Sequence, residues 1–291
     1  MEKTLLVPFS DTHCGAPGGL TTEEHQWSPK ARRAAGRWGT IQRDTRNEYK
    51  KIIEWTKTNL KPVVDAVGFI GDGVDGQNLK EGGVGQVLTD PEEQAYMCAE
   101  LISWWEAKNY FFVHGSTYHT GSGMDHEALV PVFLQKILDE RGDDARIVPI
   151  DTERFVKIGG KMIQARHHTG QTTVPYSFGT PLAKEWLSNL MWFMQDMKDP
   201  IVPLADLYIQ AHIHAYGRVG GFLNNKEWDS FSLPALQVGV PHTTRTKFTR
   251  KLGARPIHWG VVPMLLENGK VSAFPQISSV KSTKAEVITI G

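Results

Sequence analysis

The order of apolar runs along this chain constrains its fold more than any other feature. In the first half, short runs such as "TLLVPF", "VDAVGFIGD" and "YFFVHG" alternate with segments of helical periodicity. The clearest helix is "DPEEQAYMCAELISWWEAKN", because Asp90 and Pro91 suit a helix N-terminus. After about residue 150 the pattern changes to short strands, with a hairpin turn at Gly159-Gly160 and one strong helix from Thr180 to Gln195. We therefore predict an α/β fold in which two sheets pack face to face with helices outside.

Composition excludes several classes of protein. The 291 residues are 40% hydrophobic and 22% charged, as in an ordinary globular protein, and we expect a single domain over 1–291 with a long inserted loop at about 16–39. Lys+Arg 32 balances Asp+Glu 32, so no global charge attracts nucleic acid. No run approaches the ~20 apolar residues of a membrane helix. Cys14 and Cys98 make no disulfide framework, which favours a cytoplasmic location.

Carboxylates and imidazoles gather where the predicted strands end. In open α/β sheets this edge is where ligands bind. The i, i+2 spacing in "DTH" and "HIH" places both side chains of each pair on one side of an extended segment. Mixed carboxylate and imidazole donors without paired thiolates suit Mn²⁺, Fe or Zn²⁺ and argue against a structural zinc site. The residues concerned are Asp11, His13, Asp72, Asp75, His114, His119, His167, His168, His212 and His214.

The same series resembles a known family. In chain order, "DTH", "GDGVD", a histidine-bearing third block, "HH" and "HIH" are similar to the motifs DxH, GDxxD, GNH[DE], H and GHxH of the calcineurin-like metallophosphoesterases. The resemblance spans Asp11 to His214 and implies a four-layer αββα architecture. It also implies two divalent metal ions, Mn²⁺ first with Fe, Zn or Ni as alternatives, and a hydroxide shared by the ions that attacks a phosphoester.

The resemblance assigns a role to each matching position. Asp11 and His13 would hold one ion, which His214 would complete. Asp72 would bridge to the second ion, held also by His212. Either His167 or His168 would be the remaining ligand, and the sequence does not choose between them. Asp75 would support the catalytic site by orienting a ligand or by capping the turn.

The third block departs from the family pattern. It reads Gly115-Ser116-Thr117-Tyr118-His119, so the expected asparagine is absent and the histidine comes later. Ser116 or Thr117 would take the place of asparagine as an oxygen donor, and His119 would be the displaced proton donor. This block is also similar to a branch of the superfamily found often in bacteriophage genomes.

The substrate is expected to be a phosphodiester in a nucleotide, DNA or RNA. The early loop follows the first two ligands and carries Trp27, Arg32 and Arg33, which would stack on a base and neutralise phosphates. Three alternatives remain at this point. One is a metal-binding homologue with little catalysis, the second is a phosphomonoesterase of small molecules, and the third is a nucleic-acid-binding module with a secondary metal site. The sequence indicates no oligomeric state.

Overall fold

The computed structural model describes residues 3–25, 38–77, 86–120, 125–168, 170, 179–195, 198, 200, 202–223, 226–238 and 258–278. Its helices are α2 (Trp38–Asn59), α3 (Pro91–Ser103), α4 (Thr117–Thr120), the 3₁₀ helix η1 (His126–Ala128), α5 (Leu129–Arg141) and α6 (Gly179–Gln195). Its strands are β1 (Thr4–Phe9), β2 (Ala66–Ile70), β3 (Asn109–Val113), β4 (Arg146–Ile147), β5 (Glu153–Ile158), β6 (Lys161–Arg166), β7 (Leu207–Gln210), β8 (Gly217–Leu223), β9 (Lys226–Ser232), β10 (Trp259–Val261), β11 (Met264–Glu267), β12 (Lys270–Ala273) and β13 (Gln276–Ser278).

Two mixed sheets form the centre of the molecule. The first has the order β12-β11-β1-β2-β3-β4, in which β1 to β4 run parallel and β11 and β12 are antiparallel additions. The second has the order β5-β6-β7-β9-β8, with β6, β7 and β9 parallel. Strands β10 and β13 pair separately. The parallel strands of each sheet end at a common edge, which brings the loops after them together.

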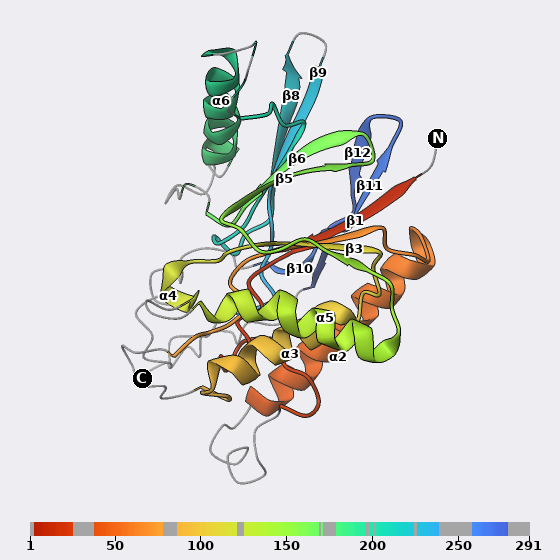
Figure 1. The fold of residues 1–291 in the computed structure, drawn as a ribbon, viewed down its shortest axis with the longest axis vertical. Coiled ribbons are helices and arrows are strands. Elements are labelled where there is room, and N and C mark those ends of the chain that lie inside the picture. Colours follow the sequence, from red (N-terminus) through yellow and green to blue (C-terminus); the bar gives the residue numbers. More distant parts are fainter. Residues whose placement is uncertain are drawn as a thin grey trace, which may run out of the picture.

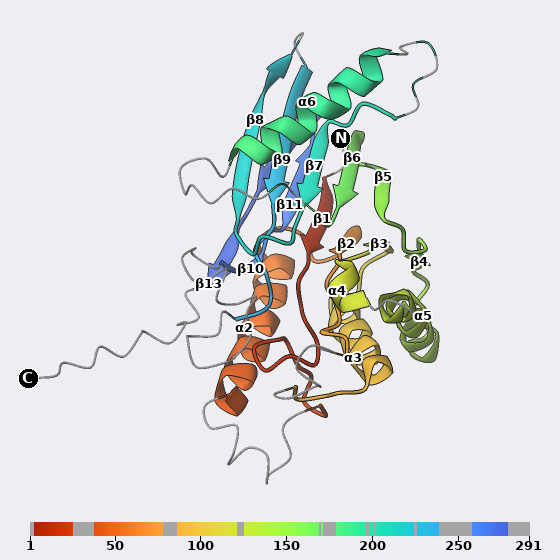
Figure 2. The same ribbon diagram turned by 90° about the vertical axis from the view of Figure 1, so that its left-hand side faces the viewer.

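Three apolar layers hold these elements in a four-layer arrangement (Figures 1 and 2). Side chains such as Leu6, Phe111 and Ile209 fill the space between the two sheets. Helices α2, α3 and α5 cover the outer face of the first sheet, and α6 covers the second sheet through Trp186 and Tyr208. The predicted two-sheet sandwich flanked by helices is confirmed.

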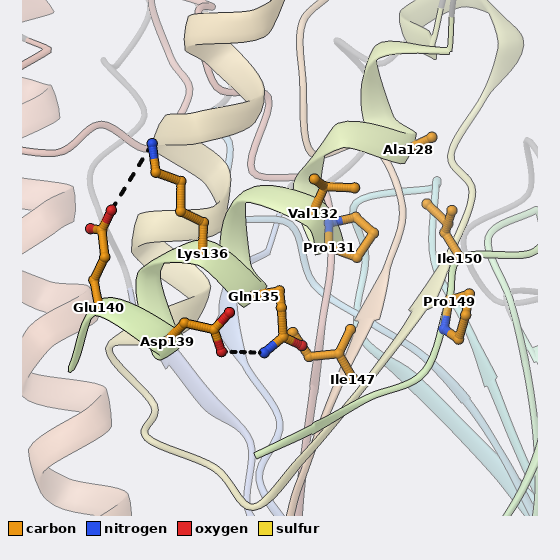
Figure 3. A pocket seen from close by; sticks show the side chains of 10 residues that line it. All are labelled: Ala128, Pro131, Val132, Gln135, Lys136, Asp139, Glu140, Ile147, Pro149 and Ile150. Carbon is orange, nitrogen blue, oxygen red and sulfur yellow. Dashed lines mark hydrogen bonds and ion pairs between the residues drawn. The ribbon is translucent and has the colours of Figure 1, made fainter. Parts of the chain in front are cut away.

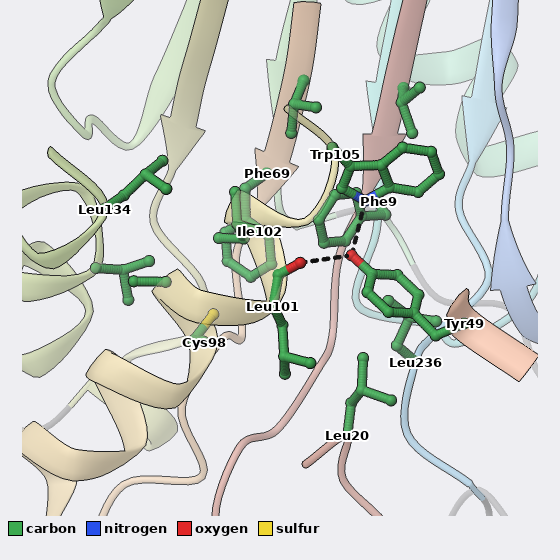
Figure 4. Close-up of a cluster of buried hydrophobic side chains, with 14 of the residues drawn as sticks. Phe9, Leu20, Tyr49, Phe69, Cys98, Leu101, Ile102, Trp105, Leu134 and Leu236 are labelled. Atoms are coloured by element: carbon green, nitrogen blue, oxygen red, sulfur yellow. Dashed lines mark hydrogen bonds between the residues drawn. The ribbon is translucent and has the colours of Figure 1, made fainter. Parts of the chain in front are cut away.

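The core under the first sheet anchors the end of β1, where the polar residues begin (Figure 4). Phe9, the last residue of β1, packs edge to face against Tyr49 of α2 with ring centroids 6.1 Å apart. Trp105 donates a hydrogen bond from Nε1 to the Tyr49 hydroxyl at 2.7 Å, and that hydroxyl donates to the Leu101 carbonyl at 3.2 Å. All three polar atoms are therefore satisfied inside the core, which fixes β1 relative to α2 and α3.

Local signals predicted most helix ends and turns. Asp90 caps α3 by accepting from the amides of Glu92 and Glu93, and Gly142 ends α5 with a φ of 74°. The β5–β6 hairpin turns at Gly159 and Gly160, which have φ values of 56° and 80°. These three predictions are confirmed.

Two parts of the second half differ from expectation. The short strands expected after residue 150 included the segment "SLPALQVG", but its described residues beyond Ser232, 233–238, form only an isolated bridge between Ala235 and Trp259. The hairpin of β8 and β9 was not expected, because glycines interrupt the alternation of β8 ("GRVGGFL"). The apolar residues of "SLPALQVG" are thus buried without belonging to a sheet beyond Ser232.

Part of the early loop is outside the described residues. Trp27, Arg32 and Arg33 all belong to that part, so their predicted role in binding substrate remains a prediction. Within the described ranges, none of the helices combines the length and the apolar character that crossing a membrane requires.

Candidate metal centre

The loops that follow five strands of the two sheets converge and bring most of the predicted ligands together. Strands β1, β2 and β3 of the first sheet and β6 and β7 of the second each end shortly before a polar residue of the site. The described residues that could hold metal ions fall into groups whose ligand atoms lie within 4.8 Å of one another. The groups are Asp11, His13 and His214; Asp72, His167 and His212; and His13, Asp75 and His119.

We call Asp11, His13 and His214 the first cluster. The Asp11 Oδ1 atom lies 3.1 Å from His214 Nε2 and 3.7 Å from His13 Nε2. All three side chains are at most 2% exposed. Asp11 Oδ1 and both ring nitrogens of His13 have no hydrogen-bond partner. Buried polar atoms are seldom left without a hydrogen-bond partner. These atoms of the first cluster are therefore candidates to bind a cation.

We call Asp72, His167 and His212 the second cluster. The Asp72 Oδ2 atom lies 3.0 Å from His167 Nε2 and 3.9 Å from His212 Nδ1. The two imidazoles also approach each other, with His167 Nε2 and His212 Nδ1 3.2 Å apart. The Ile70 carbonyl at the end of β2 lies 2.6 Å from His167 Nδ1 and fixes that ring. All three ligands of this cluster lie within 4 Å of one another, whereas in the first cluster neither ring nitrogen of His13 has a hydrogen-bond partner.

The backbone at these residues adopts an uncommon conformation. Among the described residues, seven other than glycine have a positive φ, and five of these belong to the two clusters. They are Asp11, His13, Asp72, His212 and His214, with φ values of 54°, 43°, 53°, 74° and 53°. The side chains of "DTH" and "HIH" therefore converge from left-handed turns, and the expected extended geometry is wrong. Left-handed backbone costs energy and concentrates at functional sites.

Each carboxylate has one oxygen held by the protein and the other directed at imidazoles. Asp11 Oδ2 accepts from the Ser10 hydroxyl at 2.6 Å and from the His212 amide at 3.4 Å. Asp72 Oδ1 accepts from the Ser116 amide at 2.6 Å and from its hydroxyl at 3.0 Å. These bonds orient both carboxylates before any ligand arrives, as partners behind metal ligands do.

Electrostatics keep both carboxylates ionised. Burial alone would raise the pKa of Asp11, but the adjacent imidazoles of His214 and His13 outweigh burial and lower it. Burial likewise opposes ionisation of Asp72, and chiefly His167 and His119 hold its pKa well below the usual value. Burial and His119 lower the pKa of His13, which favours the neutral imidazole that ligates metals. The anionic carboxylates and neutral imidazole suit divalent cations.

His119 lies beside the first cluster and is oriented by Asp75. Its ring centroid is 4.6 Å from that of His13. His119 Nδ1 lies 3.1 Å from the Asp75 carbonyl and 3.9 Å from Asp75 Oδ1. Asp75 is itself held at Oδ2 by an amide hydrogen bond of 2.6 Å from Gln86. The His119 ring is thus fixed through Nδ1, as a group that exchanges a proton at Nε2 requires.

Burial and hydrogen bonding distinguish between the alternative ligands that the sequence left open. His167 is buried in the second cluster, whereas His168 is exposed, with its ring centroid 4.4 Å from that of His212. Ser116 is buried and bonded to Asp72. Thr117 begins α4 with its side chain exposed. The geometry brings His167 and Ser116 to the second cluster.

Sequence reasoning missed two polar residues that contact these loops. Ser10 precedes the first motif and holds Asp11. Glu127 is fully buried and accepts hydrogen bonds from the amides of Gly73 and Gly115. A serine at a strand end and a glutamate in a helical run are both common, so the sequence offered no signal for either.

A separate pocket of about 620 Å³ lies along α5 and the segment around β4 (Figure 3). Apolar side chains such as Val132, Ile147 and Ile150 line it, and its charged residues, Lys136, Asp139 and Glu140, belong to α5. None of its lining residues belongs to either cluster. This pocket is distinct from the metal centre.

No protein-family model matches the chain, and no curated protein matches its sequence. Among solved structures, the chain is similar to a single mutant of Vps29 from Entamoeba histolytica, with 11% identity, 95% of this chain and 100% of the other covered, and a TM-score of 0.38. It is similar to a purple acid phosphatase from yellow lupin seeds, with 11% identity, 91% and 49% covered, and a TM-score of 0.40. It is also similar to the sulfate thiohydrolase SoxB from Thermus thermophilus, with 9% identity, 95% and 56% covered, and a TM-score of 0.38. At these scores the likenesses support no statement about the activity of this chain.

Proposed function

We propose that this protein is a two-metal phosphoesterase of the calcineurin-like metallophosphoesterase type, and that it hydrolyses a phosphodiester. One observation carries the proposal. Two Asp/His clusters adjoin each other, and the His212 amide of the second donates to Asp11 of the first. Both ring nitrogens of His13 are buried without hydrogen-bond partners, and the nearby Asp11 carboxylate is buried and ionised. Packing alone does not explain such buried polar groups on left-handed backbone, whereas a bound cation does.

The chain's own residues would hold the two ions in unequal surroundings. Asp11, His13 and His214 would hold one, and Asp72, His167 and His212 the other, with Asp72 shared between them. Two divalent cations at one site polarise a phosphoryl group and activate water for in-line attack. We propose Mn²⁺ first, with Fe, Zn²⁺ or Ni²⁺ as alternatives, because the donors are carboxylate and imidazole.

His119 would supply the proton that the leaving oxygen needs. Its Nδ1 faces the Asp75 carbonyl and carboxylate, so Nε2 is the atom free to carry and release that proton. The Asp75 carbonyl, 3.1 Å from Nδ1, keeps the ring in one orientation. General acid help of this kind is typically worth ~10²–10⁴ in rate.

For the substrate we propose a diester within a nucleotide or nucleic acid. Support comes from the sequence, since Arg32, Arg33 and Trp27 follow the first two ligands in the chain. Arginine and tryptophan together bind phosphate and stack on bases. The zero formal net charge of the chain provides no long-range attraction for nucleic acid.

A substrate screen in added Mn²⁺ tests this proposal. Bis-nitrophenyl phosphate and oligonucleotides should be cleaved faster than phosphomonoesters, and Asp72→Asn should abolish turnover of all of them. Asp139→Asn is the matched control, because Asp139 is exposed on α5 and its carboxylate accepts a hydrogen bond from Gln135. Faster cleavage of phosphomonoesters would favour the small-molecule alternative. Tight Mn²⁺ binding without turnover of any ester would favour a metal-binding homologue.

A further inference from the structure

The loops after β2 and β3 approach so closely that their backbones touch. A methyl group built on Gly71 would lie 2.5 Å from the Gly115 Cα atom. One built on Gly115 would lie 2.2 Å from the Asp72 amide nitrogen and equally close to its Oδ1. Only glycine fits at these two positions. The position of Asp72 therefore depends on how these two loops are held together.

One buried side chain bonds to both loops. Glu127 Oε1 accepts from the Gly73 amide at 2.7 Å, and Glu127 Oε2 accepts from the Gly115 amide at 2.5 Å. The side chain has no exposed surface. Gly73 directly follows Asp72 of the second cluster, and Gly115 directly precedes Ser116, whose amide donates to Asp72. The two carboxylate oxygens thus span the two loops.

Glu127 is itself held in place by the start of its helix. It lies in η1, which Asp125 caps by accepting from the Ala128 amide at 3.2 Å. His114, at the end of β3, contacts the same Asp125 carboxylate at 3.2 Å through Nδ1. Helix α5 follows directly and packs against α3. The carboxylate of Glu127 is therefore presented by a fixed element.

We propose that Glu127 is a positioning residue for the second cation. By joining the two loops it keeps the Ser116 amide and hydroxyl on Asp72 Oδ1, which leaves Asp72 Oδ2 directed at His167 and His212. The proposal rests on the proposed metal centre but not on its catalytic activity. Glu127 makes no contact with Asp11, His13 or His214 among the hydrogen bonds and ion pairs described, so its effect should be larger on the second ion than on the first, which shares only Asp72.

The charge balance around Glu127 agrees with this role. Burial, and then the nearby Asp72 charge, raise the pKa of Glu127 to about 7, while His167 acts in the opposite direction. Cys98 of α3 is a further ionisable neighbour. Two buried carboxylates this close repel each other, and a divalent cation next to Asp72 offsets that repulsion.

Mn²⁺ binding measured by calorimetry on metal-free Glu127→Gln tests the proposal. Glutamine can accept only one of the two amide hydrogen bonds, so the loops should separate. Loss of an outer partner typically weakens metal binding about 10- to 100-fold, and we expect this for the second ion, with a smaller loss for the first ion, which shares only Asp72. Glu100→Gln is the matched control, because Glu100 is a partly buried glutamate of α3 whose surroundings also raise its pKa. It should bind both ions as the wild type does.

Amide NMR on the wild type keeps the proposal testable if Glu127→Gln fails to fold. The Gly73 and Gly115 amide signals should shift together with one titration midpoint near pH 7, set by the carboxylate that both contact. Unchanged second-ion affinity in folded Glu127→Gln, or independent titration of the two amides, would overturn the proposal. A wild type that binds no Mn²⁺ would instead contradict the metal centre itself, so the two failures are distinguishable.

Discussion

The two clusters use the same kinds of side chain but differ in how those side chains are satisfied. In the first cluster, Asp11 Oδ1 lies 3.1 Å from His214 Nε2, but both nitrogens of His13 are buried without hydrogen-bond partners. In the second, His167 Nε2 lies 3.0 Å from Asp72 Oδ2 and also 3.2 Å from His212 Nδ1. Each cluster thus has one carboxylate–imidazole contact, and the second has an additional contact between its two imidazoles.

This difference implies unequal affinities. A cation entering either cluster must replace one carboxylate–imidazole contact. A cation entering the second must also replace the contact between His167 and His212, and a neutral hydrogen bond contributes about 0.5–1.5 kcal/mol. Second-ion binding should therefore be about 2- to 10-fold weaker. Preorganisation of donor atoms, rather than their number, would set the order of filling.

The largest expected effect comes from Asp72→Asn, which should weaken Mn²⁺ binding at both clusters together. Leaving a buried charged partner uncompensated costs about 3–5 kcal/mol, so each affinity measured by Mn²⁺ calorimetry should fall about 10²- to 10⁴-fold. Asp11→Asn is the matched change in the first cluster and should weaken the first ion much more than the second. If Asp72→Asn affected only the second ion, Asp72 would not be shared.

His119→Ala should separate catalysis from metal binding. Turnover of diesters with poor leaving groups should fall ~10²–10⁴-fold, because no general acid protonates the leaving oxygen. Nitrophenyl esters should lose much less, since their leaving group needs no proton. Both Mn²⁺ affinities should stay near those of the wild type. Equal losses on both ester classes, with weaker binding of the first ion, would show that His119 is instead a ligand beside His13.

The pH dependence of stability probes the charge behind the second cluster. Because the pKa of Glu127 is raised from 4.5 to about 7, chiefly by burial and then by Asp72, the folded protein holds this proton more tightly than the unfolded chain. The resulting stability is complete below about pH 4.5 and is lost as the pH rises through about 7. In metal-free protein, the free energy of unfolding of wild type minus that of Glu127→Gln should fall by up to about 3 kcal/mol across this window.

Denaturant unfolding at a series of pH values measures this difference. Mn²⁺ in the second cluster should reduce it, because a cation beside Asp72 offsets the charge that helps raise the pKa of Glu127. Glu100→Gln again serves as the control for a buried glutamate distant from Asp72. A difference that does not vary with pH would show that Glu127 keeps an ordinary pKa.

The smallest effect is expected from Ser116→Ala. This change removes the hydroxyl that donates to Asp72 Oδ1 but keeps the Ser116 amide bond. Activity should require about tenfold more Mn²⁺, since one hydrogen bond to a charged group contributes roughly 1.5 kcal/mol or more. The exposed Thr117 offers the matched change, Thr117→Val. An increased Mn²⁺ requirement in Thr117→Val alone would identify Thr117 as the replacement for the missing asparagine.

Much of the fold could be predicted from local sequence. Asp90, Gly142 and the Gly159–Gly160 turn act through short-range geometry, and each marks the element boundary it predicted. The β8–β9 hairpin could not be predicted in this way. Its pairing depends on β7 and on the stacking of Trp228 against Trp186 of α6, rings 4.1 Å apart from distant parts of the chain.

The site was predictable in its residues but not in its geometry. Strand ends identified Asp11 and Asp72, yet the left-handed backbone that aims them depends on contacts such as the Asp11 amide bond to the Gly71 carbonyl at 2.9 Å. The choice of His167 over His168 depends on burial against β2, which is equally non-local. Glu127 was missed because its partners are backbone amides of distant loops, which no side-chain pattern reveals.

Calorimetric titration of metal-free wild-type protein with Mn²⁺ tests the central claim most directly. We expect two ions per chain, the second bound about 2- to 10-fold more weakly. Asp11→Asn should lower the affinity of the tighter site. One ion per chain under Mn²⁺ excess, or two ions of equal affinity, would contradict a two-metal centre with unequal clusters.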